Sequence, residues 1–272
     1  MGISREWRLV VTEVIIVRDE DEAGGIYARC VGDLIARRPD CVLGLATGSS
    51  PLAAYRALAA LVRERGLDVS RVRGFALDEY VGLDPGHPQS YRSTIDRTVV
   101  RPLGLDPALV HVPDGDPAGV RDAGRRYDEA IGRAGGVDVQ ILGVGTDGHI
   151  GFNEPGSSLG SGTRLKTLAE RTRIDNARFF DGDVDRVPTH CITQGIGTIL
   201  RARHLVLLAF GEGKAEAVAE SVEGGVSSFC PASALQLHPH ATVIVDEAAA
   251  SRLRNRDYYR YAYAHKPAWQ GI

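Results

Sequence analysis

Short apolar runs rich in Val, Ile and Leu alternate with helix-like segments along most of the chain. This alternation is typical of a parallel sheet, because each strand needs a crossover helix to return the chain to the same end. The runs expected as strands are 12–17, 41–46, 73–77, 137–144, 204–210 and 242–245. The segments expected as helices are 19–38, 51–65, 90–100, 118–134, 213–223, 232–237 and 247–255. We therefore expect an α/β fold, a Rossmann-like, doubly wound, mostly parallel sheet with helices on both faces.

The composition is that of an ordinary globular protein. The chain has 272 residues, of which 43% are hydrophobic and 25% charged. Glycine and proline are spread along the chain and do not mark a linker, so one domain over residues 1–272 is expected. Residues 156–188 are the exception, because they are rich in Gly, Ser, Arg and Asp and lack a strand–helix rhythm. We expect this excursion to form a mobile lid.

Charge and cysteine spacing argue against several classes of protein. The net charge of -3 and the lack of any run of five basic residues give no attraction for nucleic acid or an anionic membrane. We also find neither a stretch of membrane-spanning length nor a signal-peptide pattern, and therefore expect a soluble, cytoplasmic protein. No C-x-x-C pair points to a disulfide framework or a zinc site. The four cysteines are expected in the core: Cys30, Cys41, Cys191 and Cys230.

Residues 143–155 place Asp147, His149 and Glu154 among glycines directly after an apolar run. Ligands of open α/β sheets bind at the carboxyl ends of the strands, where this segment emerges. Two acids and an imidazole crowded into a tight loop are costly, which favours an acid/base site. The alternative is a solvated turn in which His149 caps a backbone group.

A second strand end, residues 45–51, runs into small polar residues and then a helix that begins at Pro51. Backbone N–H groups and hydroxyls at a helix N-terminus can hold a phosphate. The segment is neither a Walker loop nor a G-x-G-x-x-G motif, and helix capping alone also explains the serines. The candidate phosphate-binding residues are Thr47, Gly48, Ser49 and Ser50.

A third strand end hands over to Asp78 and Glu79 before a loop at 82–89. Asp78 would face the same crevice as His149 and is a candidate general base, with Glu79 or Tyr80 beside it. The alternative is that Asp78 caps the next turn. The expected lid also carries bases that suit phosphate capture, although scattered arginines are often only solvated: Arg164, Lys166, Arg171, Arg173 and Arg178.

These segments together resemble the glucosamine-6-phosphate deaminase (isomerase) family. The similar blocks occur in the same order as in that family: LGLATGSSPLAAY, FALDEYVGLDPGHPQSY, ILGVGTDGHIGFNEPGSS, TRLKTL, TRIDNARFF, VPTHCITQGIGTIL and LQLHPH. The resemblance implies hydrolytic deamination of D-glucosamine 6-phosphate to D-fructose 6-phosphate and ammonia, in amino-sugar catabolism. It also implies that no metal or organic cofactor takes part.

The family pattern implies roles for the candidate residues. Asp78 matches the base that moves a proton from C2 to C1, and His149 matches the group that opens the sugar ring. Asp147 and Glu154 match the acids that support this histidine. The residues that match the phosphate-binding set are Ser49, Ser50, Arg178 and Lys214. Ala46, the Ser49–Ser50 pair and Thr146 depart from residues common in the family, but none of these changes removes a reacting group.

Some family members bind N-acetylglucosamine 6-phosphate between subunits as an allosteric effector. Ser158, Arg164 and Lys166 match those effector-binding positions. They could equally form lid or interface salt bridges. Some relatives are hexamers, so the resemblance leaves a homo-oligomer open for this chain.

Two other functions are alternatives to this expectation. A 6-phosphogluconolactonase would share the fold and a phosphate loop, but ester hydrolysis has no need for Asp78 together with the ring-opening group. A non-enzymatic sugar-phosphate sensor would need a DNA-binding module, for which no room precedes the first expected strand. The aromatic C-terminal tail could dock on its own core, on a neighbour or on the lid: Tyr258, Tyr259, Tyr261, Tyr263 and Trp269.

Overall fold

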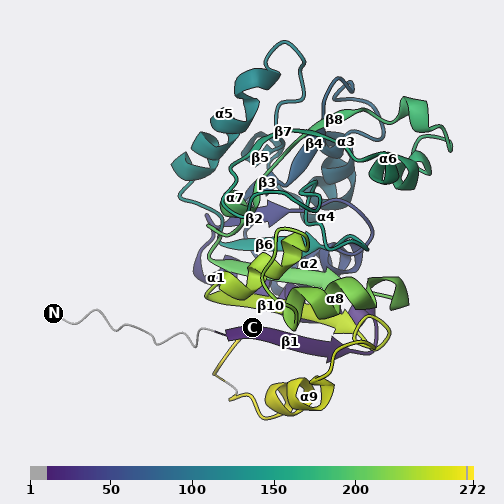
Figure 1. Ribbon diagram of the computed structural model, residues 1–272. Helices are drawn as coiled ribbons and strands as arrows, with labels where there is room; N and C mark the ends of the chain where they lie inside the picture. The colour runs from purple at the N-terminus through teal and green to yellow at the C-terminus, as the bar shows by residue number, and fades with distance from the viewer. Residues whose placement is uncertain (1–10, 268) are drawn as a thin grey trace.

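The computed structural model describes residues 11–267 and 269–272. Within these residues, the main sheet has seven parallel strands in the order β1-β10-β9-β6-β2-β3-β5 (Figure 1). Its strands are β1 (Val11–Val17), β2 (Val42–Leu45), β3 (Arg73–Ala76), β5 (Val110–His111), β6 (Val139–Gly143), β9 (His204–Ala209) and β10 (His240–Asp246). The expected mostly parallel sheet is confirmed, and each of the six predicted strands is present.

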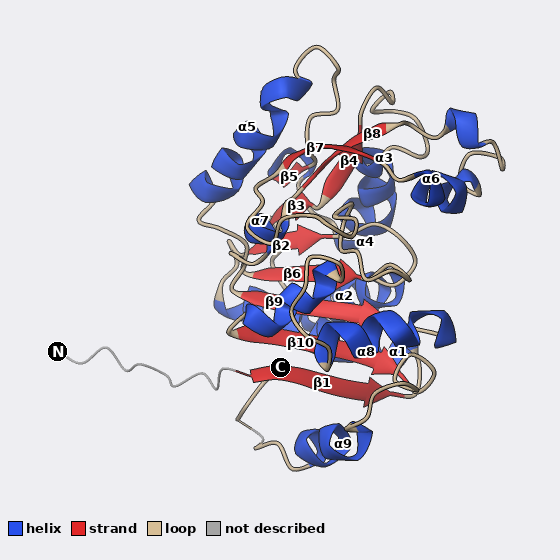
Figure 2. Cartoon of the chain, viewed as in Figure 1, coloured by secondary structure: helices blue, strands red, loops and turns tan. Residues whose placement is uncertain are grey.

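Helices lie on both faces of the main sheet (Figure 2). In Figure 1, α1 and α2 pack against each other behind the strands, while α8 lies in front. The helices are α1 (Glu20–Arg37), α2 (Leu52–Arg65), α3 (Tyr91–Ile95), α4 (Arg101–Leu103), α5 (Val120–Arg133), α6 (Glu170–Ala177), α7 (Ile196–Ile199), α8 (Ala215–Val222) and α9 (Arg256–Ala264). Shorter helical turns cover Asp96–Val100, Pro107–Leu109, Val184–Arg186, Glu212–Lys214 and Pro231–Leu237.

Local sequence explains where the first helices begin and end. Asp19 caps α1 by accepting a hydrogen bond from the backbone N–H of Glu22, and three acidic residues occupy the first turn. Helix α2 follows Pro51 and ends at Gly66, whose φ of 60° is in the left-handed region that favours glycine. The observed bounds of α2 agree with the expected helix 51–65 to within one residue.

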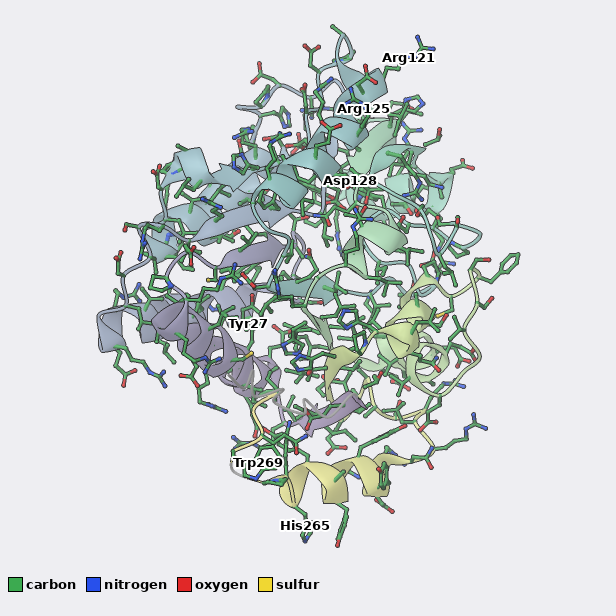
Figure 3. The ribbon with its side chains drawn as sticks, turned by 90° about the vertical axis from the view of Figure 1, so that its left-hand side faces the viewer. Tyr27, Arg121, Arg125, Asp128, His265 and Trp269 are labelled. Atoms are coloured by element: carbon green, nitrogen blue, oxygen red, sulfur yellow. The ribbon has the colours of Figure 1, made fainter. Side chains whose placement is uncertain are left out.

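A second, three-stranded antiparallel sheet extends from the main sheet. It consists of β4 (Asp78–Tyr80), β8 (His190–Thr193) and β7 (Arg164–Thr167), with β8 in the middle. Asp128 on α5, labelled in Figure 3, accepts hydrogen bonds from the hydroxyls of Thr163 and Thr198 and so fixes the entry to β7. A separate apolar cluster packs under this sheet: Tyr80, Phe152, Leu168, Ala177, Phe180, Val187 and Cys191.

The structure differs from the sequence-based expectations in three places. Residues 247–255 were expected to be a helix but form successive turns, in which Asp246 accepts a hydrogen bond from the N–H of Ala249. Helix α9 was not predicted. Residues 156–188 contain β7 and α6, although the sequence shows no strand–helix rhythm there, because β7 is half-exposed and α6 is strongly polar.

Some of the cysteines and of the C-terminal aromatic residues lie in or against the core, and the others are exposed or partly exposed. Cys41, Cys191 and Cys230 are buried, as expected, whereas Cys30 is partly exposed. Helix α9 lies beside β1, where Lys266 pairs with Glu13. Tyr259 and Tyr263 pack against the main core, while the remaining aromatic residues are exposed: Tyr258, Tyr261 and Trp269, the last labelled in Figure 3. Among the described residues, no helix is both long and apolar enough to cross a membrane.

Candidate active site

The main sheet has a topological switch point between β2 and β6. β2 is followed along the chain by its neighbour β3, and β6 is followed through a longer excursion by its other neighbour β9. The connections that leave β2 and β6 therefore run in opposite directions, and open α/β sheets bind ligands at the carboxyl ends of strands beside such a point. Both loops carry candidate residues. Ser50 lies beside the end of β6, since a Cβ added to Gly143 would be 3.8 Å from its hydroxyl oxygen.

The loop after β2 presents small polar groups at the start of α2. Gly48 has a φ of 97°, and a Cβ added there would meet nothing within 4 Å, so its backbone borders open space. Ser49 is exposed, and the first turn of α2 has no side-chain cap. Thr47 lies close to the Tyr91 hydroxyl. This loop can therefore offer N–H groups and serine hydroxyls to an anion.

His149 is held by two carboxylates of its own loop. Its Nδ1 lies 2.7 Å from the Asp147 Oδ1 and 3.9 Å from the Glu154 Oε2. The hydrogen bond from the His149 ring is the main reason that the pKa of Asp147 lies far below its ordinary value. Because Asp147 occupies Nδ1, Nε2 is the ring nitrogen left for proton exchange with a ligand. Sequence analysis placed these three residues together, and the structure does the same.

Asp78 is the first residue of β4 and is almost completely buried. Burial, and secondarily the neighbouring Glu79, raises the pKa of Asp78 well above its ordinary value. A Cβ added to Gly151 would lie 2.9 Å from the Thr193 hydroxyl and 3.4 Å from the Asp78 Oδ2. The Asp78 carboxylate thus lies against the loop that carries His149. With its φ of 57°, Gly151 permits this close approach.

Glu79 is occupied by backbone groups. Its carboxylate accepts hydrogen bonds from the N–H groups of Tyr80, Tyr91 and Arg92 at the beginning of α3. It is therefore a structural anchor for α3, and Asp78 is the acid that lies against the loop of His149.

Two basic side chains from distant segments, Arg178 and Lys214, lie near the loop of His149. Lys214 is half-buried, and desolvation lowers its pKa, with Asp147 opposing and Arg178 reinforcing that shift. Lys214 is therefore close enough to interact electrostatically with both Arg178 and Asp147 of the His149 loop. Arg178 follows α6 and is exposed, with its guanidinium 4.7 Å from the centre of the Phe179 ring. This pair is positioned to attract an anion.

The three residues matched to an effector site lie in different surroundings. Arg164 donates a hydrogen bond of 2.8 Å to the side-chain oxygen of the buried Asn153, and desolvation lowers its pKa. Lys166 is half-buried in β7, and Ser158 is exposed. Within the described residues no ion pair involves Arg164 or Lys166, although the excursion 156–188 does contain one, between Arg186 and Asp181. Arg164 instead ties β7 to the loop of His149.

Sequence analysis missed two side chains of α6. Thr172 donates a hydrogen bond to the Glu154 Oε1, and Asn176 donates one of 3.0 Å to the Tyr80 hydroxyl. The Tyr80 ring in turn packs against the Tyr91 ring, with the ring centroids 4.9 Å apart. No pattern in the sequence identifies these residues, because α6 is polar on most of its surface. Their spacing of four residues, which puts both on one side of the helix, is the only sequence feature that Thr172 and Asn176 share.

Asp147, His149 and Glu154 are also close enough to ligate a cation, since their ligand atoms lie within 4.8 Å of one another. The hydrogen bond between Asp147 and His149 already accounts for two of them. Asp147 and His149 can therefore act as a hydrogen-bonded acid/base pair without an ion, with the Glu154 carboxylate beside them.

Known proteins match this chain over nearly its whole length. Residues 20–244 match the family described as glucosamine-6-phosphate isomerases/6-phosphogluconolactonase. The glucosamine-6-phosphate deaminase of Bifidobacterium longum is 73% identical over 270 residues, which cover 96% of this chain and 99% of the relative. That of Streptomyces coelicolor is 63% identical over 260 residues, covering 96% and 100%.

Solved structures agree with these matches. The structure of a monomeric glucosamine-6-phosphate deaminase has a TM-score of 0.85 and 40% identity, covering 89% of this chain and 100% of its own. A 6-phosphogluconolactonase from Trypanosoma cruzi has a TM-score of 0.70 at 18% identity, covering 90% and 98%, and supports the fold alone. The resemblance inferred from the ordered sequence blocks is thereby confirmed: this chain belongs to the family of glucosamine-6-phosphate isomerases and 6-phosphogluconolactonases.

Proposed function

We propose that the protein is a glucosamine-6-phosphate deaminase, which converts D-glucosamine 6-phosphate and water to D-fructose 6-phosphate and ammonia. The observation that carries this proposal is the convergence of a buried carboxylate, Asp78, with the His149 imidazole and its two neighbouring acids, Asp147 and Glu154, at one switch point. Ring opening and isomerisation need two separate proton-transfer groups, and this site offers both. Close relatives named as deaminases support the same assignment.

In the first step, His149 moves a proton from the anomeric hydroxyl to the ring oxygen. Asp147 holds the imidazole by its Nδ1, so that Nε2 faces the sugar. Glu154 approaches the same nitrogen and favours the positive charge that the ring carries during transfer. The product of this step is the open-chain aldehyde.

In the second step, Asp78 removes the C2 proton and returns it to C1 through an enolamine. Its surroundings make the carboxylate more basic than an exposed aspartate, which suits removal of a weakly acidic C–H proton. The resulting C2 iminium adds water and releases ammonia.

The phosphate is assigned to the loop 47–50, Arg178 and Lys214. The uncapped start of α2 and the half-buried Lys214 support this assignment. Binding the remote phosphate fixes the reacting carbons relative to Asp78 and His149.

Residues 156–188 are proposed to act as a lid over the bound sugar. Apolar side chains of this segment pack around Phe180 together with Tyr80, Phe152 and Cys191, in a cluster separate from the main core, and this separation supports independent movement of the segment. The proposal extends to a cytoplasmic place in amino-sugar metabolism. Self-association, including a hexamer, stays a prediction, and one similar solved structure is of a monomeric deaminase.

The test is a paired assay of ammonia release from D-glucosamine 6-phosphate and of hydrolysis of 6-phosphogluconolactone. We expect ammonia release with formation of fructose 6-phosphate, and no lactone hydrolysis above the spontaneous rate. The reverse pattern would assign the lactonase function. Binding of the sugar phosphate without either reaction would favour the sensor.

A further inference from the structure

Helix α6 contacts the candidate active site through two polar side chains one turn apart. Thr172 donates to Glu154 and Asn176 donates to the Tyr80 hydroxyl. Residues four apart lie on the same side of a helix, so one face of α6 is directed at the site. Thr172 is 8% exposed, whereas Ile174, on another side of the helix, is 55% exposed.

The Thr172 hydroxyl forms its hydrogen bond outside its own helix. In a helix, Thr commonly bonds back to a carbonyl of the preceding turn, which satisfies the hydroxyl locally. Here the hydroxyl leaves its own helix and binds a carboxylate on the His149 loop. Hydrogen bonds to an ionised acceptor are short and strong, so this contact fixes the orientation of the acceptor.

Glu154 depends on that contact. Its Oε1 is held by Thr172, while its Oε2 lies 3.9 Å from the His149 Nδ1, beyond hydrogen-bond distance. Among the described residues, Thr172 is the one hydrogen-bond donor to this carboxylate. Without it, the rotatable glutamate side chain would lose its fixed position beside the imidazole.

We propose that Thr172 is a positioning residue that holds Glu154 beside His149, so that ring opening depends on the seating of α6. This inference rests on the proposed deaminase function. Helix α6 then has a role in catalysis, because it supplies a hydrogen bond to the acid beside His149.

The experiment compares Thr172→Val, which keeps the shape and removes the hydroxyl, with Thr172→Ser, which keeps the hydroxyl. Thr189→Val is the matched control, because Thr189 is an exposed threonine just beyond the same excursion. We expect Thr172→Val to lower kcat about 10-fold to 100-fold, the range typical when a supporting hydrogen bond is removed. The pH profile of kcat should shift, KM should change little, and Thr172→Ser and Thr189→Val should stay near the parent.

A double-mutant cycle with Glu154→Gln shows whether Thr172 acts through Glu154. Thr172→Val should cost much less in the Glu154→Gln background than in the parent. Equal costs in the two backgrounds, or a Thr172→Ser variant as slow as Thr172→Val, would overturn the positioning role. Thr172→Ala repeats the comparison if the valine variant does not fold.

The proposal and the proposed function fail in different ways. A parent protein that releases no ammonia from D-glucosamine 6-phosphate refutes the function. A parent that releases ammonia, with Thr172→Val and Thr172→Ala as fast as Thr189→Val, refutes only the role of Thr172.

Discussion

The two aspartates of the candidate site lie in opposite electrostatic surroundings. The hydrogen bond from His149 lowers the pKa of Asp147, whereas burial raises the pKa of Asp78. Environments that push two acids apart in this way are typical of sites that need both a fixed charge and a proton carrier. Asp147 suits the fixed charge that orients the imidazole, and Asp78 suits the proton carrier.

Asp78→Asn should abolish isomerisation without abolishing binding. The amide cannot accept the C2 proton, so turnover should fall by about 100-fold to 10,000-fold while substrate affinity stays within a few-fold of the parent. Exchange of the C2 proton with solvent, followed by NMR, should be lost in parallel. Exchange at the parent rate in this variant would place the base elsewhere.

The same substitution should stabilise the fold at neutral pH. The pKa of Asp78 is raised in the folded protein, so its stabilising contribution is present in acid and is lost as the pH rises through the folded-state pKa. An amide does not ionise, so the Asp78→Asn protein does not lose stability in this pH range. Its free energy of unfolding at neutral pH should exceed that of the parent by about 1 kcal/mol, which corresponds to a rise of roughly 2–4 °C in Tm. The difference should vanish near pH 4, about the ordinary aspartate pKa. Asp185→Asn, at an exposed position, is the control and should show no such trend.

His149→Gln should separate ring opening from the later steps. We expect it to slow the cyclic substrate far more than an open-chain analogue, because the analogue has no ring to open. Asp147→Asn and Glu154→Gln should fall between the parent and His149→Gln, since they alter the surroundings of the imidazole and keep the ring itself. Equal slowing of both substrates would assign His149 to another step.

At the residue scale, the sequence indicated the groups that follow strands. Asp147, His149 and Glu154 stand out because acids and an imidazole interrupt a glycine-rich loop, and Asp78 stands out at a strand end. Thr172 and the anchoring role of Glu79 could not be predicted, because both depend on contacts between segments distant in sequence.

At the scale of elements, the main sheet was predictable and the second sheet was not. Strands such as β9 are buried along their whole length and read as continuous apolar runs. Strand β7 alternates between half-buried and exposed positions, with Leu165 44% exposed, so its sequence resembles a loop. Its pairing with β8 is set by tertiary contacts that a local pattern does not contain.

Helix α6 and the segment before α8 should act together on the phosphate. Arg178→Ala should raise KM and also lower kcat, because the phosphate's binding energy orients the sugar, and Lys214→Gln should do the same. We expect a loss of about 10-fold in kcat/KM for each, the usual cost of one charge-assisted hydrogen bond. Arg171→Ala, an exposed arginine on α6, is the matched control and should leave both constants unchanged. An effect confined to KM would indicate that the phosphate contributes binding without orientation.

At the scale of the whole molecule, any allosteric response should depend on β7. Lys166→Ala and Arg164→Ala should abolish activation by N-acetylglucosamine 6-phosphate while maximal turnover stays near the parent, because an effector shifts a conformational equilibrium only. Rates and size-exclusion chromatography, each with and without the effector, check this. Hyperbolic kinetics with no response in the parent would leave both residues as structural, as the bond between Arg164 and Asn153 already suggests for one of them.

The pairing of β1 with β10 has a consequence for biosynthesis. β1 is the first described strand, yet its neighbour in the sheet is β10, with Val11 opposite His240. A ribosome releases the chain from its N-terminus, so β1 has no native neighbour in the sheet until the chain has been translated through β10. Pairing of this kind is slow and leaves a hydrophobic strand open to incorrect partners meanwhile. The pairing of the edge strand β1 with β10 is therefore the last pairing of the main sheet to form. Until then, β1 is the strand of a nascent chain that would need a chaperone.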